Sequence, residues 1–168
     1  LTSTWRVSQG GLGQSFASLA EAMSVMTRGT GWRVADARDV EPDDGGRIDH
    51  GTMFGYAVRE GLIDPRKSVQ MGIRTTFTGE TTMGFRIVYA DEVHDSSSGQ
   101  LAAIIKKQVG KSKAYLTFDI DCLDPSVAPG TGTPIAGGMT YHQAASVIRK
   151  LTDVNFVAMD VVEVSPPY

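Results

Sequence analysis

The chain has 168 residues, with 16 Lys and Arg against 19 Asp and Glu, which gives a formal charge of −3. This balance excludes the strongly basic face of a nucleic-acid-binding module, and no apolar run approaches the roughly 20 residues of a transmembrane helix. One cysteine excludes a disulfide framework, so we expect a reducing, cytoplasmic setting. The chain contains no internal repeat or linker, and we expect a single domain.

The first half alternates short regular segments with Gly-rich loops. Helical segments are predicted from apolar residues three and four positions apart, and strands from alternation. In the last strand of this half, we expect Val69, Met71 and Ile73 to share one side. In chain order, the expected elements are a helix over 15–28, a strand over 32–35, a loop over 36–49, a short helix within 51–61 and a strand over 67–74.

The second half carries clearer helix signals. Gly110 should end one helix, and Thr140 with Gln143 has the spacing of a capping box at the start of another. The expected elements are a loop over 75–84, strands over 86–90 and 114–120, a helix over 100–108, a Pro/Gly-rich loop over 125–138, a helix from 140 and a strand within 155–164.

Strands and helices alternate along the chain, and the strongest strands are nearly continuous apolar runs. This pattern predicts an α/β fold with a mainly parallel sheet covered by helices on both faces. Ligands in such folds bind beyond the carboxyl ends of the strands.

The sharpest chemical feature is Asp119-Ile-Asp121 at the end of the strand over 114–120. Residues two apart in a strand share a face, so the two carboxylates would lie together and repel each other. A hard cation such as Mn²⁺ or Mg²⁺ would relieve this repulsion. Alternatively, these aspartates and Asp124 are turn and capping residues, which is the interpretation we favour for Asp124. Alternation points Cys122 away from the carboxylates, as a small packing residue.

An Asp-x-Asp after an apolar strand also resembles the nucleophile motif of haloacid-dehalogenase-type phosphatases. Those motifs usually continue with Thr or Val two residues after the second aspartate, where this chain has Leu123. We therefore keep this interpretation only as a minor alternative.

Longer motifs resemble the ureohydrolase family. They include LTFDIDCLDP ending at Pro125, APGTGTP ending at Pro134, and MDVVEVSPPY ending at Tyr168. The upstream motifs DHGTMF, EGLIDP and GIRT are similar to the agmatinase branch of that family. The resemblance covers residues 36–168 as one partial domain, whereas residues 1–35 do not match.

The resemblance implies a three-layer arginase-type α/β fold and two Mn²⁺ ions that activate water for attack on a guanidinium carbon. It assigns Asp39, Asp119 and Asp121 as metal ligands and Glu163 as the acid that binds the guanidinium. His50 matches a histidine that passes a proton to the departing amine, and Thr131 lies in the turn that lines the site. Without the family, His50 could be an exposed loop histidine and Glu163 could form a surface ion pair.

Two imidazole ligands of the family have no counterpart. The segment Asp36-Ala-Arg-Asp39 stands where the family has Asp-Ala-His-x-Asp, and Gly10-Gly-Leu-Gly13 contains no histidine. We expect His94, in a polar loop, and His142, in a first helical turn, to be structural, as we do Asp160. Three explanations compete: an incomplete or mistranslated 5′ region, a natural variant of low activity, and a rearranged active site. We favour the first, because both defects lie near the start.

The expected activity is manganese-dependent hydrolysis of a small guanidino compound, most simply agmatine to putrescine and urea. The alternatives are another linear guanidino substrate, such as guanidinobutyrate, or a non-catalytic remnant. The resemblance also implies a homo-oligomer, either a trimer or a hexamer.

Overall fold

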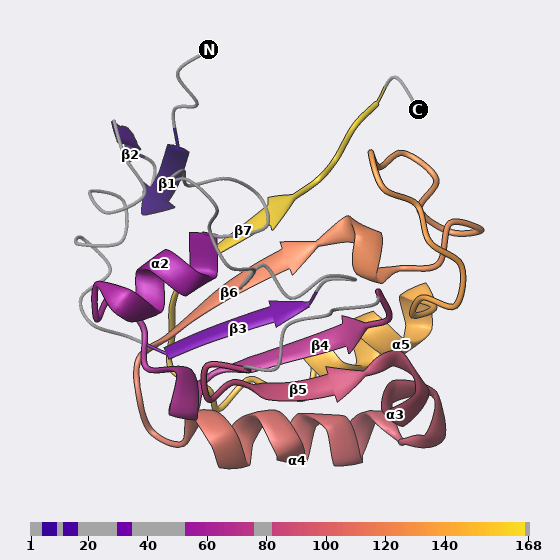
Figure 1. The fold of residues 1–168 in the computed structure, drawn as a ribbon, viewed down its shortest axis with the longest axis horizontal. Helices are drawn as coiled ribbons and strands as arrows, with labels where there is room; N and C mark the ends of the chain where they lie inside the picture. The colour runs from indigo at the N-terminus through magenta and orange to yellow at the C-terminus, as the bar shows by residue number, and fades with distance from the viewer. Residues whose placement is uncertain (1–4, 10–11, 17–29, 35–52, 76–81, 167–168) are drawn as a thin grey trace.

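The computed structural model describes residues 5–9, 12–16, 30–34, 53–75 and 82–166 (Figure 1). Parallel strands alternate with helices, as the sequence predicts. The helices are α2 (Met53–Arg59), α3 (Ala90–Asp95), α4 (Ser98–Val109) and α5 (Tyr141–Ile148), with the 3₁₀ turns η1 (Pro65–Lys67) and η2 (Ile120–Cys122). The strands are β1 (Trp5–Gln9), β2 (Leu12–Phe16), β3 (Thr30–Val34), β4 (Val69–Ile73), β5 (Arg86–Tyr89), β6 (Ala114–Asp119) and β7 (Phe156–Val162).

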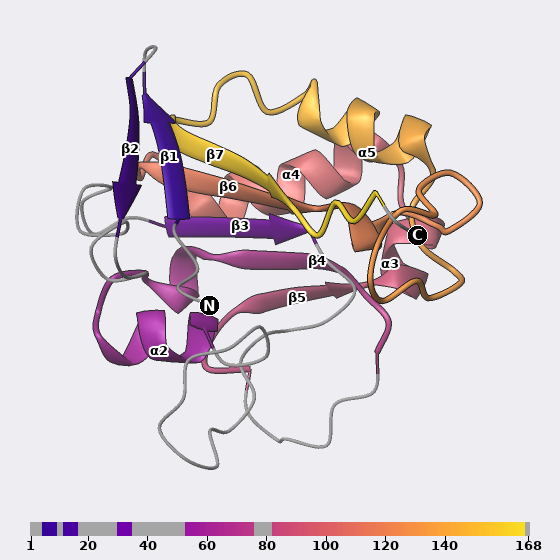
Figure 2. The same cartoon turned by 90° about the horizontal axis from the view of Figure 1, so that it is seen from above.

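Five strands form one sheet in the order β5-β4-β3-β6-β7, and every neighbouring pair in it is parallel (Figure 2). β1 and β2 form a separate antiparallel pair. All carboxyl ends of the five strands therefore meet at one edge of the sheet, the edge at which ligands bind in such folds. No helix among the described residues is both long and apolar enough to cross a membrane.

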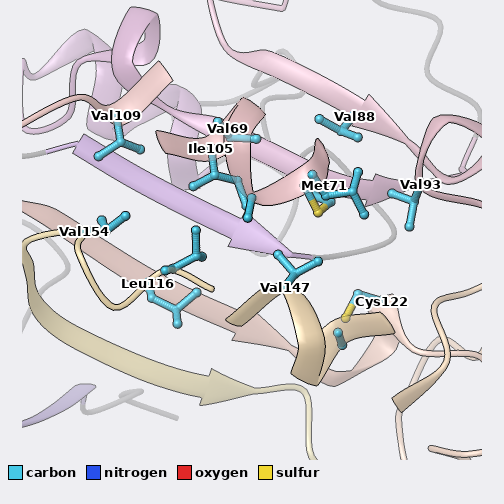
Figure 3. Close-up of a cluster of buried hydrophobic side chains, with 14 of the residues drawn as sticks. Val69, Met71, Val88, Val93, Ile105, Val109, Leu116, Cys122, Val147 and Val154 are labelled. Carbon is cyan, nitrogen blue, oxygen red and sulfur yellow. The ribbon is translucent and has the colours of Figure 1, made fainter. Parts of the chain in front are cut away.

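The face of the sheet covered by α3, α4 and α5 holds the larger core (Figure 3). Along α4, buried side chains recur at helical spacing, so one stripe of the helix packs on the sheet while its lysines remain outside. The core includes Val69, Met71, Val88, Leu101, Ile105, Val109, Leu116, Cys122, Val147 and Leu151.

A second cluster forms around α2, from Phe54, Ala57, Ile73, Phe85 and Ile87, with Ile63. Ile73 thus leaves the side that Val69 and Met71 share, and the prediction that all three lie together is wrong. The register of β4 against β5 shifts between Met71 and Ile73, and the intervening Gly72 has φ 91. The irregularity turns Ile73 toward the opposite core, and all five residues of β4 are buried.

The helix ends follow the predicted local chemistry. Gly110 ends α4 with φ 62, and Thr140 forms a capping box with Gln143 at the start of α5. Two expectations are wrong: Ser15 and Phe16 belong to β2 instead of a helix, and His94 lies in α3 instead of a loop. The rest of the expected helix over 15–28 and the loop over 36–49 lie outside the described residues.

Candidate functional site

Two aspartates lie buried at the carboxyl end of β6. Asp119 is the last residue of the strand and is 1% exposed, and Asp121 is 4% exposed. The Asp119 Oδ1 accepts a hydrogen bond from the backbone N–H of Asp121 at 3.0 Å. Carboxylates removed from water in this way are stabilised by hydrogen-bond donors and by a cation, because burial disfavours the ionised form of an isolated acid.

The chain leaves the strand conformation directly after Asp119. Residues 120–122 form the 3₁₀ turn η2, which the Asp119 side chain caps, so the prediction of a strand continuing through Ile120 is wrong at its end. The two aspartates are neighbours through the cap of a tight turn, not through strand alternation. Cys122 is fully buried in the larger core, as predicted for a packing residue, although the turn and not alternation places it there.

The polar loop that follows is fastened to this turn by Asp124. Its carboxylate accepts hydrogen bonds from the backbone N–H groups of Ser126 at 3.0 Å, Gly137 at 2.9 Å and Gly138 at 3.3 Å. A side-chain hydrogen bond from Ser126 is the largest cause, and together with these backbone bonds it lowers the pKa of Asp124 from 3.8 to about 2. Asp124 is thus the turn residue that the sequence indicates.

A backbone bridge closes the same loop. The N–H of Asp124 donates to the carbonyl of Met139, and the N–H of Met139 donates to the carbonyl of Cys122, both at 2.9 Å. The segment 125–138 is therefore a closed loop, and the residues that flank it are hydrogen-bonded to each other directly after the aspartate pair.

Glu163 follows β7 at the same edge of the sheet. Asp119 is the register partner of Val162, so Glu163 comes one residue after the position beside Asp119. Its backbone has φ 60, in the left-handed region that non-glycine residues rarely adopt. Such strain costs on the order of 1–3 kcal/mol and clusters at functional positions, where the surrounding structure holds it.

Thr131 is brought to the same place by the segment after β7. The N–H of Ser165 donates to the carbonyl of Gly130 at 2.8 Å, which links the neighbours of Glu163 and Thr131. Thr131 is 2% exposed, and its hydroxyl has no hydrogen-bond partner among the described residues. A buried hydroxyl of this kind is stabilised when it acquires a partner, as a bound ligand can provide.

Two further residues contact Asp121, and neither is among the site residues that the sequence predicts. The Thr133 hydroxyl donates to the Asp121 Oδ2 at 3.3 Å, and the Arg74 guanidinium donates to the Asp121 carbonyl at 2.6 Å. Both lie in motifs that carried the family resemblance, GTGTP for Thr133 and GIRT for Arg74. These motifs are the signal in the sequence that could have identified Thr133 and Arg74. A motif does not show, however, which groups a side chain contacts in the folded chain.

The structure therefore gathers Asp119, Asp121, Thr131 and Glu163 at one sheet edge. Asp39 and His50 lie outside the described residues. Within the described part of the chain, no group of three or more His, Cys, Asp and Glu side chains lies close enough together to hold a metal ion. The two buried carboxylates still fit part of a manganese site, since oxygen donors suit this ion.

The remaining candidates have structural surroundings. His94 lies within hydrogen-bond distance of the carbonyl of Gly137, at 3.0 Å, and His142 is an exposed residue in the first turn of α5, as predicted. Asp160 accepts a hydrogen bond from the hydroxyl of Tyr115 on the neighbouring strand.

Comparison with known proteins gives two family matches. The sequence model of the arginase family matches residues 35–168. A model of a domain of unknown function (DUF4390) matches residues 1–50. The first match covers most of the chain, including Asp119, Asp121, Thr131 and Glu163.

Curated relatives include an agmatinase of Chromobacterium violaceum, 56% identical over 131 residues, and an agmatinase of Proteus mirabilis, 54% identical over 125 residues. These alignments cover 77% and 74% of this chain, but only 40% of each relative. The chain thus spans well under half the length of these relatives.

Two solved structures have the same fold over most of the chain. A hypothetical agmatinase from Burkholderia thailandensis superposes with a TM-score of 0.80 at 45% identity, covering 84% of this chain and 44% of that one. Proclavaminate amidino hydrolase from Streptomyces clavuligerus gives 0.82 at 36% identity, covering 89% of this chain and 52% of that one. The expected arginase-type α/β fold is confirmed.

Proposed function

Because the chain belongs to the arginase family, we propose that its sheet edge is the metal- and guanidinium-binding part of a manganese-dependent ureohydrolase. The substrate is agmatine, which is hydrolysed to putrescine and urea. The agmatinases of Chromobacterium violaceum and Proteus mirabilis, at 56% and 54% identity, support this substrate over other linear guanidino compounds.

One observation carries the proposal. Two almost fully buried carboxylates lie at the carboxyl end of β6, and a third acid with a strained backbone follows the carboxyl end of the neighbouring strand β7. A structural turn needs neither the burial of both aspartates nor the left-handed backbone of Glu163. A site for two different positive charges, a metal ion and a guanidinium group, accounts for both features.

Asp119 and Asp121 would hold the manganese from the end of β6, together with Asp39. Manganese, when bound, supplies an activated water near neutral pH. The hydrogen bond from Thr133 orients the Asp121 carboxylate, and the N–H of Asp121 fixes one oxygen of Asp119. Oriented ligands of this kind bind a metal more tightly than free ones, because less side-chain freedom is lost.

Glu163 would bind the substrate. Its carboxylate can accept two parallel hydrogen bonds from the planar guanidinium, which fixes the carbon to be attacked relative to the aspartates. Thr131, whose buried hydroxyl has no partner in the part of the chain that the structure describes, provides one more polar contact in the same place.

The overall reaction adds water across the guanidinium carbon. A new bond forms between the water oxygen and this carbon, and the bond from the carbon to the alkyl nitrogen breaks. The water supplies the protons that balance the products, and His50 would deliver one of them to the departing amine, since an imidazole titrates near neutral pH. Urea and putrescine leave.

The missing imidazole ligands favour a second candidate, a non-catalytic remnant. The segment 36–39 reads Asp-Ala-Arg-Asp, without the expected histidine. Such a chain would keep the fold but bind manganese weakly, because two ligands are absent and the remaining carboxylates repel one another.

Urea release separates the candidates. Purified chain with added Mn²⁺ should release urea from agmatine faster than from guanidinobutyrate or arginine. Faster release from guanidinobutyrate would replace the proposed substrate. A folded sample that releases no urea from any of the three would instead support the non-catalytic remnant. A cytoplasmic location and a trimer or hexamer remain our predictions for the assembled protein.

A further inference from the structure

Arg74, the residue directly after β4, directs its guanidinium at backbone carbonyl groups. Its Nη2 donates to the carbonyl of Asp121 at 2.6 Å and to that of Ile135 at 2.7 Å. Its Nε donates to the same Ile135 carbonyl at 3.1 Å. Longer contacts reach the carbonyls of Gly72 at 3.3 Å and Leu123 at 3.5 Å.

These carbonyls belong to three segments that are far apart in sequence. Gly72 lies in β4, Asp121 in the turn η2, and Ile135 in the loop that returns to Met139. One side chain therefore joins the end of a central strand to both sides of the loop that follows the aspartate pair. Among the described residues, the partners of this cation are backbone carbonyl groups, so its contribution depends on geometry more than on ion pairing.

The joined segments carry the groups that orient Asp121. Thr133, whose hydroxyl donates to the Asp121 Oδ2, lies two residues before Ile135. The planar guanidinium of Arg74 thus holds the backbone of the segment that carries Thr133, the donor, and the backbone of Asp121, the acceptor. If the two segments separate, the 3.3 Å hydrogen bond between Thr133 and Asp121 is lost first.

We propose that Arg74 is a positioning residue, which sets the orientation of the Asp121 carboxylate for metal binding by fixing η2 against the loop at Ile135. The metal-binding consequence rests on the function proposed above, whereas the positioning itself does not.

Lysine should not replace Arg74 in this role. The guanidinium presents five N–H donors in a rigid fork, and here both Nε and Nη2 are used at once. An ammonium group has one nitrogen on a more flexible stem, so it lacks the second bond from Nε to Ile135 and the Nη1 contact with Gly72 that fix the plane of the guanidinium.

The test compares Arg74→Lys with Arg86→Lys in the whole chain. Arg86 is a suitable control, because it is also partly buried on a strand but pairs with Glu92 of α3, away from η2. Amide hydrogen exchange is measured at Leu123, Asp124 and Met139, whose N–H groups bond within the loop and turn, with the amides of α4 as the internal reference. Manganese affinity is measured on the same samples from the electron paramagnetic resonance signal of free Mn²⁺.

Arg74→Lys should speed exchange at the three amides by about tenfold relative to α4 and weaken manganese binding by about 10–100-fold, the usual effect of losing a residue that orients a metal ligand. Arg86→Lys should change neither. Unchanged exchange at the three amides, or equal acceleration in α4, would overturn the proposal. A wild-type chain that binds no manganese would contradict the proposed function, and the exchange pattern would still decide whether Arg74 positions the turn.

Discussion

Replacing Gly138 with alanine should be one of the more damaging small substitutions in this chain. Gly138 lies where the loop returns against the residues after η2. A Cβ atom at this position would stand 2.4 Å from the Leu123 carbonyl carbon and 2.5 Å from the Asp124 nitrogen. Both are backbone atoms, so no side chain can rotate to make room, and the chain itself must move.

The cost follows from the contacts that this movement breaks. The two hydrogen bonds of the bridge, from Asp124 to Met139 and from Met139 to Cys122, contribute about 0.5–1.5 kcal/mol each. Overpacking against fixed atoms adds about 1–3 kcal/mol. The free energy of unfolding should fall by roughly 2–6 kcal/mol, since the two terms act together.

Two other glycines of the same loop provide matched controls. Nothing lies within 4 Å of a Cβ at Gly132 or Gly137, but Gly137 has φ +86. Gly132→Ala should therefore be nearly neutral, and Gly137→Ala should cost about 1 kcal/mol or somewhat more, for backbone strain alone. Urea unfolding of the three variants, followed by circular dichroism, measures the order of their free energies of unfolding directly.

The result that would refute this reasoning is equal stability of Gly138→Ala and Gly132→Ala. The loop would then be able to shift away from Leu123 at no cost, and the bridge at Met139 would not fasten it. A loss in Gly138→Ala no larger than in Gly137→Ala would show that backbone conformation, not close approach, governs the loop.

Two further predictions concern the acids around the site. Asp124→Asn should be less stable than wild type near neutral pH, and the difference should shrink as the pH falls from 3.8 to about 2. The pKa of Asp124 is lowered in the folded chain, so the stabilisation by its carboxylate is complete above pH 3.8 and is lost when the carboxylate is protonated. The urea midpoints of both proteins are measured across this pH range. A constant difference between the midpoints of wild type and Asp124→Asn would contradict the prediction. Glu163→Gly should raise the free energy of unfolding by about 1 kcal/mol, because glycine adopts φ 60 without strain, yet abolish the proposed agmatine hydrolysis. Lower stability in Glu163→Gly, while Glu163→Gln matches wild type, would mean that the backbone there is not strained.

Most of the fold follows from local patterns in the sequence. Gly110 and the Thr140–Gln143 capping box define helix ends, and the apolar run at β6 defines the strand that carries the aspartates. These signals are local, so they do not depend on the rest of the structure. Alternation puts Ile73 on the wrong side of β4, because it assumes an unbroken strand and the irregularity at Gly72 reverses the faces.

The sequence predicts that Asp119, Asp121, Thr131 and Glu163 lie at one sheet edge, but it does not predict their geometry, and the roles of Asp39 and His50, outside the described residues, stay predictions. The spacing of Asp119 and Asp121 identified the pair, yet the pair is formed by a capped 3₁₀ turn and not by a continuing strand. Arg74 could not be found by spacing, because its shortest hydrogen bonds go to the backbone carbonyls of Asp121 and Ile135, more than 45 residues away in the chain. Such contacts arise only when the sheet is assembled.

Manganese binding by the carboxyl end of β6 is the central claim, and a titration tests it most directly. Free Mn²⁺ is followed by electron paramagnetic resonance as wild type, Asp121→Ala or His142→Ala is added. Asp121 is buried at the sheet edge, whereas His142 is exposed on α5. We expect wild type and His142→Ala to bind manganese alike and Asp121→Ala to lose binding. Equal binding by all three proteins, or equal loss in both variants, would show that the metal site is not at this edge.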